Sequence, residues 1–209
     1  MKLAIFGATG RAGRHLVAQA LDRGHAVTAL ARNPQKLADV TGQIEVAEGD
    51  VKDAEAVARV VAGADAVLSV LGPTTNLPRY EVTQGTEHIL AAMAAHDVRR
   101  LVLSTGAGVA DPSDASPLLH RVITLLLKLF SRHVYEDMRR VADTVRASDV
   151  DWTIVRVPML TDEPASDNIK AGYVGKGPGT RLSREDLASF MLNEVERGQW
   201  VRKAPVISN

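Results

Sequence analysis

Short apolar runs and helix-period segments alternate along the first half of the chain. The runs have the length and composition of buried strands, and they cover residues 2–6, 26–31, 44–47, 65–71 and 101–105. Between them, apolar residues recur every three or four positions, which predicts helices after the first run and over residues 54–61 and 81–96. This β-α-β-α order predicts a doubly wound α/β fold, with a parallel sheet, right-handed crossovers and helices on both faces.

The second half of the chain is less regular. Apolar residues at helical spacing predict a helix through residues 134–145, and an apolar run at 152–157 predicts a sixth strand. Residues 161–181 contain four glycines and predict a loop. Ser183 and Asp186 then have the spacing of a capping box, which predicts a helix that begins there and ends near residue 196.

No linker or internal repeat divides the sequence, so we expect one domain over residues 1–209. A small C-terminal substrate lobe would come mainly from residues 110–133 and 158–182. Within the first of these segments, residues 118–130 are apolar nearly all round the expected helix. Core packing is the expected role of that helix, and a lid over the substrate or a subunit contact is the alternative.

Composition removes several classes of function. Basic and acidic residues balance at 25 each, so no overall charge attracts nucleic acid or an anionic membrane. The chain has no cysteine, which excludes disulfides and thiolate chemistry, and its six histidines lack metal-ligand spacing, so no metal is expected. Neither a secretory signal nor an apolar stretch of about 20 residues is visible. We therefore expect a cytoplasmic protein, a monomer or small homo-oligomer, that acts on a small-molecule substrate.

The clearest motif follows the first predicted strand and reads Gly7-Ala8-Thr9-Gly10-Arg11-Ala12-Gly13. Gly7 permits a tight turn, Gly10 lets the backbone approach a pyrophosphate, and Gly13 lets the following helix pack on the strand. Backbone N–H groups at the positive helix end then face the phosphates, with side-chain contacts from Thr9 and Arg11. The motif predicts a Rossmann-like dinucleotide site, and the alternative is a plain strand–helix turn that binds nothing.

The end of the second strand indicates which dinucleotide is bound. An NAD site usually places an acidic residue about 20 residues past the glycines, where it binds the ribose 2′-hydroxyl. This chain has Ala31-Arg32-Asn33-Pro34 there, and the guanidinium of Arg32 suits a 2′-phosphate. The sequence therefore predicts NADP(H) in preference to NAD(H), with a solvated loop arginine as the alternative role of Arg32.

Two more strand ends carry candidate cofactor contacts. Asp50 and Val51 follow the third strand, where Asp50 would accept a hydrogen bond from the adenine amino group and Val51 would contact the ring. Asp50 could instead cap the next helix, although Asp53 is the expected N-cap. Leu71 and Gly72 end the fourth strand, where Gly72 would either let the backbone pass beside the cofactor or form an ordinary turn.

Several segments resemble the atypical short-chain dehydrogenase/reductase superfamily, in its NmrA-like branch, and biliverdin-IXβ/flavin reductases in particular. The matching segments are residues 4–10, 27–32, 49–51, 104–105 and 150–156. The resemblance implies a Rossmann-like fold that binds NADP(H). It adds Ser104 and Thr105 to the cofactor contacts, and it places Pro158, Met159 and Leu160 near the nicotinamide.

A catalytic constellation is harder to find. Many short-chain dehydrogenases use a serine together with a tyrosine and a lysine four residues apart on one helix, and the lysine lowers the tyrosine pKa from about 10. Ser104 and Tyr135 are the candidates for two of these roles, but Arg139 stands where the lysine would be and is not equivalent to it. Tyr135 would then be either an acid/base or a surface tyrosine beside a surface arginine, and Ser104 either a contact to nicotinamide or substrate or a strand-end hydroxyl.

Two functions from different classes follow. The first is NADPH-dependent reduction of a small conjugated or carbonyl acceptor of flavin, quinone or tetrapyrrole type, because direct hydride transfer to a stacked ring needs positioning and no tyrosine base. The second is an NADP(H)-binding redox sensor of NmrA type with little or no turnover, which acts through a protein partner. An epimerase-like enzyme is a weaker third. The compact chain favours the reductase.

Overall fold

The computed structural model describes residues 1–209 except 41, 116–121, 123–124, 126–129 and 167. The strands of its main sheet are β1 (Lys2–Phe6), β2 (Ala26–Ala31), β3 (Ile44–Glu48), β4 (Ala66–Ser69), β5 (Arg100–Gly106), β6 (Asp151–Val157), β8 (Lys170–Gly172) and β10 (Val206–Ser208). They lie in the order β3-β2-β1-β4-β5-β6-β10-β8, and each pair is parallel except β10 with β8. This is the predicted parallel sheet, extended by an antiparallel edge strand.

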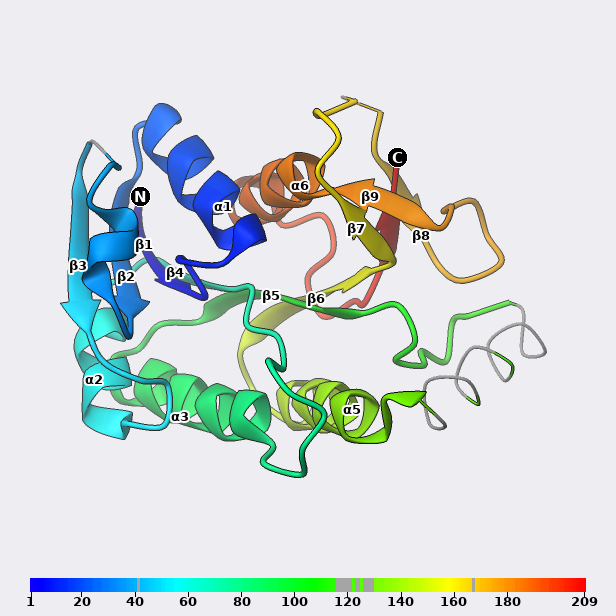
Figure 1. The fold of residues 1–209 in the computed structure, drawn as a ribbon, viewed down its shortest axis with the longest axis horizontal. Coiled ribbons are helices and arrows are strands. Elements are labelled where there is room, and N and C mark those ends of the chain that lie inside the picture. Colours follow the sequence, from blue (N-terminus) through cyan, green and yellow to red (C-terminus); the bar gives the residue numbers. More distant parts are fainter. Residues whose placement is uncertain (41, 116–121, 123–124, 126–129, 167) are drawn as a thin grey trace.

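Helices cover both faces of this sheet. They are α1 (Arg11–Asp22), α2 (Ala54–Val61), α3 (Glu81–Ala95), α5 (Arg132–Arg146), α6 (Arg184–Arg197) and the short 3-10 helix η1 (Pro34–Leu37). Helices α1 and α6 lie on one face and α2, α3 and α5 on the other (Figure 1). A second, two-stranded sheet pairs β7 (Met159–Thr161) with β9 (Arg181–Ser183). The predicted doubly wound fold with a small C-terminal addition is confirmed.

The core consists of two apolar layers that share the strands of the main sheet. Alternate residues of a strand point to opposite faces, so Phe6 packs with the α2, α3 and α5 layer while Ile5 packs with the α1 and α6 layer. Ile154 and Val155 divide in the same way on β6. A strand buried on both faces has no polar alternation, which is why these strands appear as continuous apolar runs in the sequence.

The C-terminal region differs most from prediction. The expected loop at residues 161–181 contains strand β8, and β10 was not predicted at all. Three-residue strands carry no readable periodicity, and these two are defined by hydrogen bonds to each other and to β6. The predicted start of α6 is confirmed, because the Ser183 hydroxyl accepts a hydrogen bond from the Asp186 N–H at 3.0 Å.

Most of the predicted helix at residues 118–130 lies outside the described residues. Three of its described side chains, those of Val122, Leu125 and Phe130, are exposed by 56%, 59% and 77%. The expectation of core packing is therefore wrong for these three. Among the helices that the structure describes, none combines the length and apolar character needed to cross a bilayer.

Candidate functional site

The glycine turn has the geometry that its sequence predicts. Gly7 has a φ of +83°, and a Cβ there would lie 2.9 Å from the carbonyl carbon of Val70 on the adjacent chain segment. A Cβ at Gly13 would lie 2.0 Å from the Gly7 oxygen, so helix α1 approaches the end of β1 too closely for any side chain. The Gly10 N–H donates to the same Gly7 oxygen at 3.0 Å. The turn is tight because both glycines lack a side chain.

The N-terminus of α1 is chemically suited to phosphate. Its N-cap is Gly10, which offers no side-chain acceptor to the first-turn N–H groups, and no acidic residue lies in that turn. Unpaired amides and the positive end of the helix dipole therefore remain available to an anionic ligand. The residues present thus fit the pyrophosphate of a dinucleotide.

A pocket opens beside this turn, where β1, β2, β3 and β4 end. Seven predicted cofactor residues from these four strand ends line it: Gly7, Thr9, Arg32, Asp50, Val51, Leu71 and Gly72. Seven further lining residues were not predicted: Leu30, Ala31, Gly49, Pro73, Thr74, Glu81 and Val82. In open α/β sheets, ligands bind at the carboxyl ends of the strands. The structure therefore joins the separate sequence signals into one cavity.

Arg32 and Asp50 follow β2 and β3 and line that cavity. Arg32 is exposed, and no carboxylate among the described residues pairs with it. Asp50 closes its own turn by accepting from the Lys52 N–H at 3.0 Å. The alternative of Asp50 as a helix cap is wrong, because Asp53 caps α2 by accepting from the N–H groups of Glu55 and Ala56.

Val51 is held in place from behind by helix α3. A Cβ at Gly85 would lie 2.9 Å from the Val51 Cβ, so the absence of a side chain at Gly85 makes room for the valine. His88, one turn further along α3, lies with its Nδ1 at 2.9 Å from the Val51 carbonyl oxygen. The pocket therefore has a preformed apolar surface where an adenine ring would lie.

Helix α5 fixes the start of α3, which contributes Glu81 and Val82 to the pocket. Asp137 is buried, and its carboxylate accepts hydrogen bonds from the N–H groups of Val82 at 3.3 Å and Thr83 at 2.9 Å. It thereby caps α3, whose own N-cap residue, Tyr80, has a φ of +49° and no capping side chain. Sequence reasoning missed Asp137. The available signal was an acid on the apolar stripe of a helix, a position that needs buried partners.

The side chain of Ser104 points to the face of the sheet opposite helix α5, which carries Tyr135. Ser104 alternates with Leu103 on β5 and so faces the α1 and α6 layer, whereas Tyr135 belongs to α5 on the other face. Thr105 faces the α5 layer, and its buried hydroxyl has no hydrogen-bond partner among the described residues. All three lie outside the lining of the pocket.

The tyrosine–arginine pair on α5 does not form a catalytic dyad of the expected kind. Tyr135 is only 9% exposed, so its interpretation as a surface tyrosine is wrong. Arg139 is exposed and its guanidinium is 3.2 Å from the carboxylate of Asp143, one turn further along. The cation at the lysine position therefore pairs with a carboxylate of its own helix.

The predicted nicotinamide segment lies at the end of β6. Pro158 follows that strand, and Met159 and Leu160 enter β7 as part of the small sheet. Asp162, just after β7, forms ion pairs with both Arg11 and Arg184. The guanidinium of Arg11, which was predicted to contact phosphate, thus pairs with a carboxylate of the C-terminal region.

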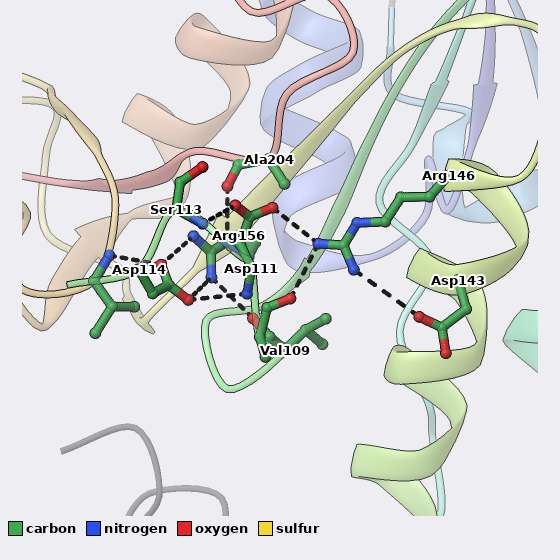
Figure 2. Close-up of polar contacts among 10 residues, drawn as sticks. Val109, Asp111, Ser113, Asp114, Asp143, Arg146, Arg156 and Ala204 are labelled. Carbon is green, nitrogen blue, oxygen red and sulfur yellow. Dashed lines mark hydrogen bonds and ion pairs between the residues drawn. The ribbon is translucent and has the colours of Figure 1, made fainter. Parts of the chain in front are cut away.

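A buried ion pair close to this segment was also missed. Arg156 on β6 is fully buried and pairs with Asp114 at 2.8 Å (Figure 2). The signal was again available, since an arginine inside a buried apolar strand must be paired.

Comparison with known proteins agrees with this geometry. The sequence model of a family described as NAD(P)H-binding matches residues 7–197. "Oxidoreductase ptaF" of Pestalotiopsis fici is 31% identical over 215 residues, which cover 95% of this chain and 80% of that protein. A Streptomyces griseus (4-alkanoyl-5-oxo-2,5-dihydrofuran-3-yl)methyl phosphate reductase is 32% identical over 152 residues, 73% of this chain. The match spans only 45% of the Streptomyces protein.

Solved structures share the fold. A Veillonella parvula short-chain dehydrogenase/reductase in complex with NADP superposes with a TM-score of 0.80 at 17% identity, covering 100% of this chain and 94% of that one. The anaerobillin reductase ChuY of Escherichia coli O157:H7 gives a TM-score of 0.78 at 18% identity, covering 100% and 97%. The chain therefore belongs to the NAD(P)H-binding family and is an NAD(P)H-dependent oxidoreductase.

Proposed function

We propose that this oxidoreductase uses NADPH and transfers hydride to a small conjugated or carbonyl acceptor of flavin, quinone or tetrapyrrole type. The observation that carries the cofactor preference is Arg32. It lines the same pocket as the glycine turn, it has no carboxylate partner among the described residues, and the end of β2 offers no acid for a ribose 2′-hydroxyl. A charge-assisted bond to the 2′-phosphate would favour NADPH over NADH by roughly ten- to a hundredfold.

The remaining pocket residues support the same orientation of the cofactor. Asp50 and Val51 would receive the adenine, with Val51 pressed against the ring by α3. The first-turn amides of α1 would bind the pyrophosphate. Gly72 has open space where a Cβ would be, so the cofactor can pass close to the backbone there. The nicotinamide would then lie towards the ends of β5 and β6, near Ser104, Thr105 and Pro158.

The acceptor class follows from the residue at the position of the catalytic lysine. NADPH, when bound, supplies a hydride, and a solvent proton completes a two-electron reduction. At the position of the catalytic lysine stands Arg139, which forms an ion pair with Asp143 and whose planar guanidinium is not equivalent to a lysine ammonium. An acceptor whose conjugated system receives the hydride directly needs alignment more than an acid/base group. Turnover should therefore survive in Tyr135→Phe.

We also propose that the chain belongs to the NmrA-like branch and that it is similar to biliverdin-IXβ/flavin reductases. The name of the Streptomyces relative describes the reduction of an oxo-dihydrofuranyl methyl phosphate by that protein. A dihydrofuranone is a small, flat ring with a carbonyl group, which is consistent with the acceptor class proposed here.

The test is NADPH oxidation measured by absorbance with flavins, menadione and biliverdin, and with NADH as the control cofactor. Arg32→Ala should weaken NADPH binding by roughly ten- to a hundredfold and leave NADH binding unchanged. Arg59→Ala is the matched control, because Arg59 is an exposed arginine that does not line the pocket. Equal losses for NADPH and NADH in Arg32→Ala would contradict the 2′-phosphate assignment.

A regulatory role is the competing outcome. A redox sensor of NmrA type would bind NADPH tightly, with the same dependence on Arg32, and would oxidise it with none of the acceptors. That result would support the assignment of NADPH as the cofactor and contradict the proposed reductase activity.

A further inference from the structure

One buried charge, on β6, does not line the cofactor pocket. Arg156 is 0% exposed although it lies on β6 between apolar neighbours. Its Nε donates to the Ala204 carbonyl at 2.8 Å and its Nη1 to the Val109 carbonyl at 2.9 Å. Both guanidinium Nη atoms also bond the Asp114 carboxylate at 2.8 Å (Figure 2). Burying a guanidinium group costs desolvation free energy, so the partners of Arg156 indicate its structural role.

Asp114 joins segments that are distant in the sequence. Besides Arg156, its carboxylate accepts the N–H of Asp111, within its own loop, and the N–H of Val174 from the turn after β8, both at 3.0 Å. Ala115 then donates its N–H to the Val174 carbonyl at 2.9 Å. One carboxylate therefore fastens the loop after β5 to the turn at residues 173–176, and Arg156 anchors both to the sheet.

These segments lie apart from the cofactor pocket. The pocket occupies the ends of β1 to β4, whereas the loop after β5 and the turn after β8 gather on the other side of the molecule (right in Figure 1). Arg156 itself stands opposite Thr105 of β5, near the carboxyl ends of both strands. A dinucleotide that runs across the strand ends brings its nicotinamide, and hence the acceptor, towards this side.

We propose that the Arg156–Asp114 pair positions the acceptor side of the site. It holds residues 107–115 and 173–176 together as the wall against which the acceptor lies, and so governs acceptor binding without contacting the cofactor. The proposal rests on the proposed reductase function. Both residues are positioning residues, since they act through the segments they hold.

The same two strands provide a matched control at their opposite ends. Arg100, at the start of β5, bonds the Asp151 carbonyl at 2.8 Å and the Thr153 hydroxyl at 2.9 Å on β6. It also lies 3.5 Å from the buried carboxylate of Glu194. The Arg100 and Glu194 side chains are 13% and 3% exposed, against 0% and 8% for Arg156 and Asp114. This second network lies at the amino ends of the strands, whereas ligands of parallel α/β sheets bind at the carboxyl ends. Loss of stability alone should therefore affect both networks alike.

The experiment compares Asp114→Asn with Glu194→Gln in the full-length protein. Both variants keep side-chain shape and remove one buried charge. The readouts are the melting temperature, the Kd for NADPH by fluorescence titration, and kcat and KM with menadione and FMN. For Asp114→Asn we expect KM for the acceptors to rise about tenfold, with kcat reduced less and the Kd for NADPH unchanged. Glu194→Gln should lower the melting temperature and leave KM unchanged.

Two results would overturn the proposal: unchanged acceptor KM in Asp114→Asn, or an equal rise of KM in both variants. Wild-type protein that binds NADPH but turns over neither acceptor would remove the proposed function instead. In that case amide hydrogen exchange still decides whether Asp114 holds the wall. Asp114→Asn should accelerate amide exchange at Ala115 and Val174 and leave exchange in the glycine turn unchanged. If exchange at both residues were as slow in Asp114→Asn as in the wild type, Asp114 would not hold the two segments together.

Discussion

The half of the molecule around the glycine turn, the proposed cofactor half, and the half around the Arg156–Asp114 pair, the proposed acceptor half, are built by different means. The glycine turn joins β1 to α1 within a few consecutive residues, and its shape depends on main-chain geometry and on missing side chains. The acceptor half depends on side chains that meet from far apart, since Asp114 is 42 residues from Arg156 and 60 from Val174. A local device is specified by a short sequence motif, whereas a long-range one forms only when the complete chain has folded.

The largest effect should come from breaking the local device. Gly13→Ala would place a Cβ 2.0 Å from the Gly7 oxygen, which forces α1 away from the end of β1. Each charge-assisted hydrogen bond to the pyrophosphate contributes about 1.5–3 kcal/mol, and moving α1 removes more than one, so NADPH affinity should fall by at least about a hundredfold. Fluorescence titration with NADPH measures it, and the acceptor half should keep its slow amide exchange at Val174.

Gly72→Ala separates ligand contact from backbone strain in the same half. A Cβ at Gly72 meets nothing within 4 Å, so the apo protein should keep its melting temperature. NADPH affinity should nevertheless fall, because the added methyl group enters the pocket. If Gly72→Ala bound NADPH as tightly as the wild type, the cofactor would not pass close to the backbone at Gly72.

In the acceptor half, the corresponding break removes a buried charge. Arg156→Met leaves the Asp114 carboxylate buried and unpaired, and we expect a loss of about 3–5 kcal/mol in the free energy of unfolding. Urea denaturation measures this loss. The double variant with Asp114→Leu should recover much of it, because an apolar pair of similar volume is often neutral in such a position. A double variant no more stable than Arg156→Met would mean that the stabilisation comes from the Val109 and Ala204 contacts.

The same division decides what the sequence predicts. The parallel fold, the glycine turn and the strand-end residues of the pocket, such as Arg32 and Val51, were all predictable because each depends on local spacing and parallel strands end at one edge. Asp137 as a cap for α3 was not, because its partners lie more than fifty residues away. Strands β8 and β10 escaped for a similar reason, since three residues acquire strand geometry only from their neighbours.

The smallest expected effect concerns the contribution of Asp114 to acid stability. Burial raises the pKa of Asp114, but hydrogen bonds from Arg156 and from the backbone N–H groups of Asp111 and Val174 outweigh it and hold the pKa below its ordinary 3.8. A carboxyl with a lowered pKa stabilises the fold fully above 3.8, and this contribution is lost as the pH falls through the lowered value. Asp114→Asn carries no such group, so the gap in melting temperature between wild type and variant should narrow below pH 4. Thermal melts of both proteins from pH 6 to pH 2 measure the gap. A constant gap would show that the carboxylate charge of Asp114 contributes nothing to holding the two segments together.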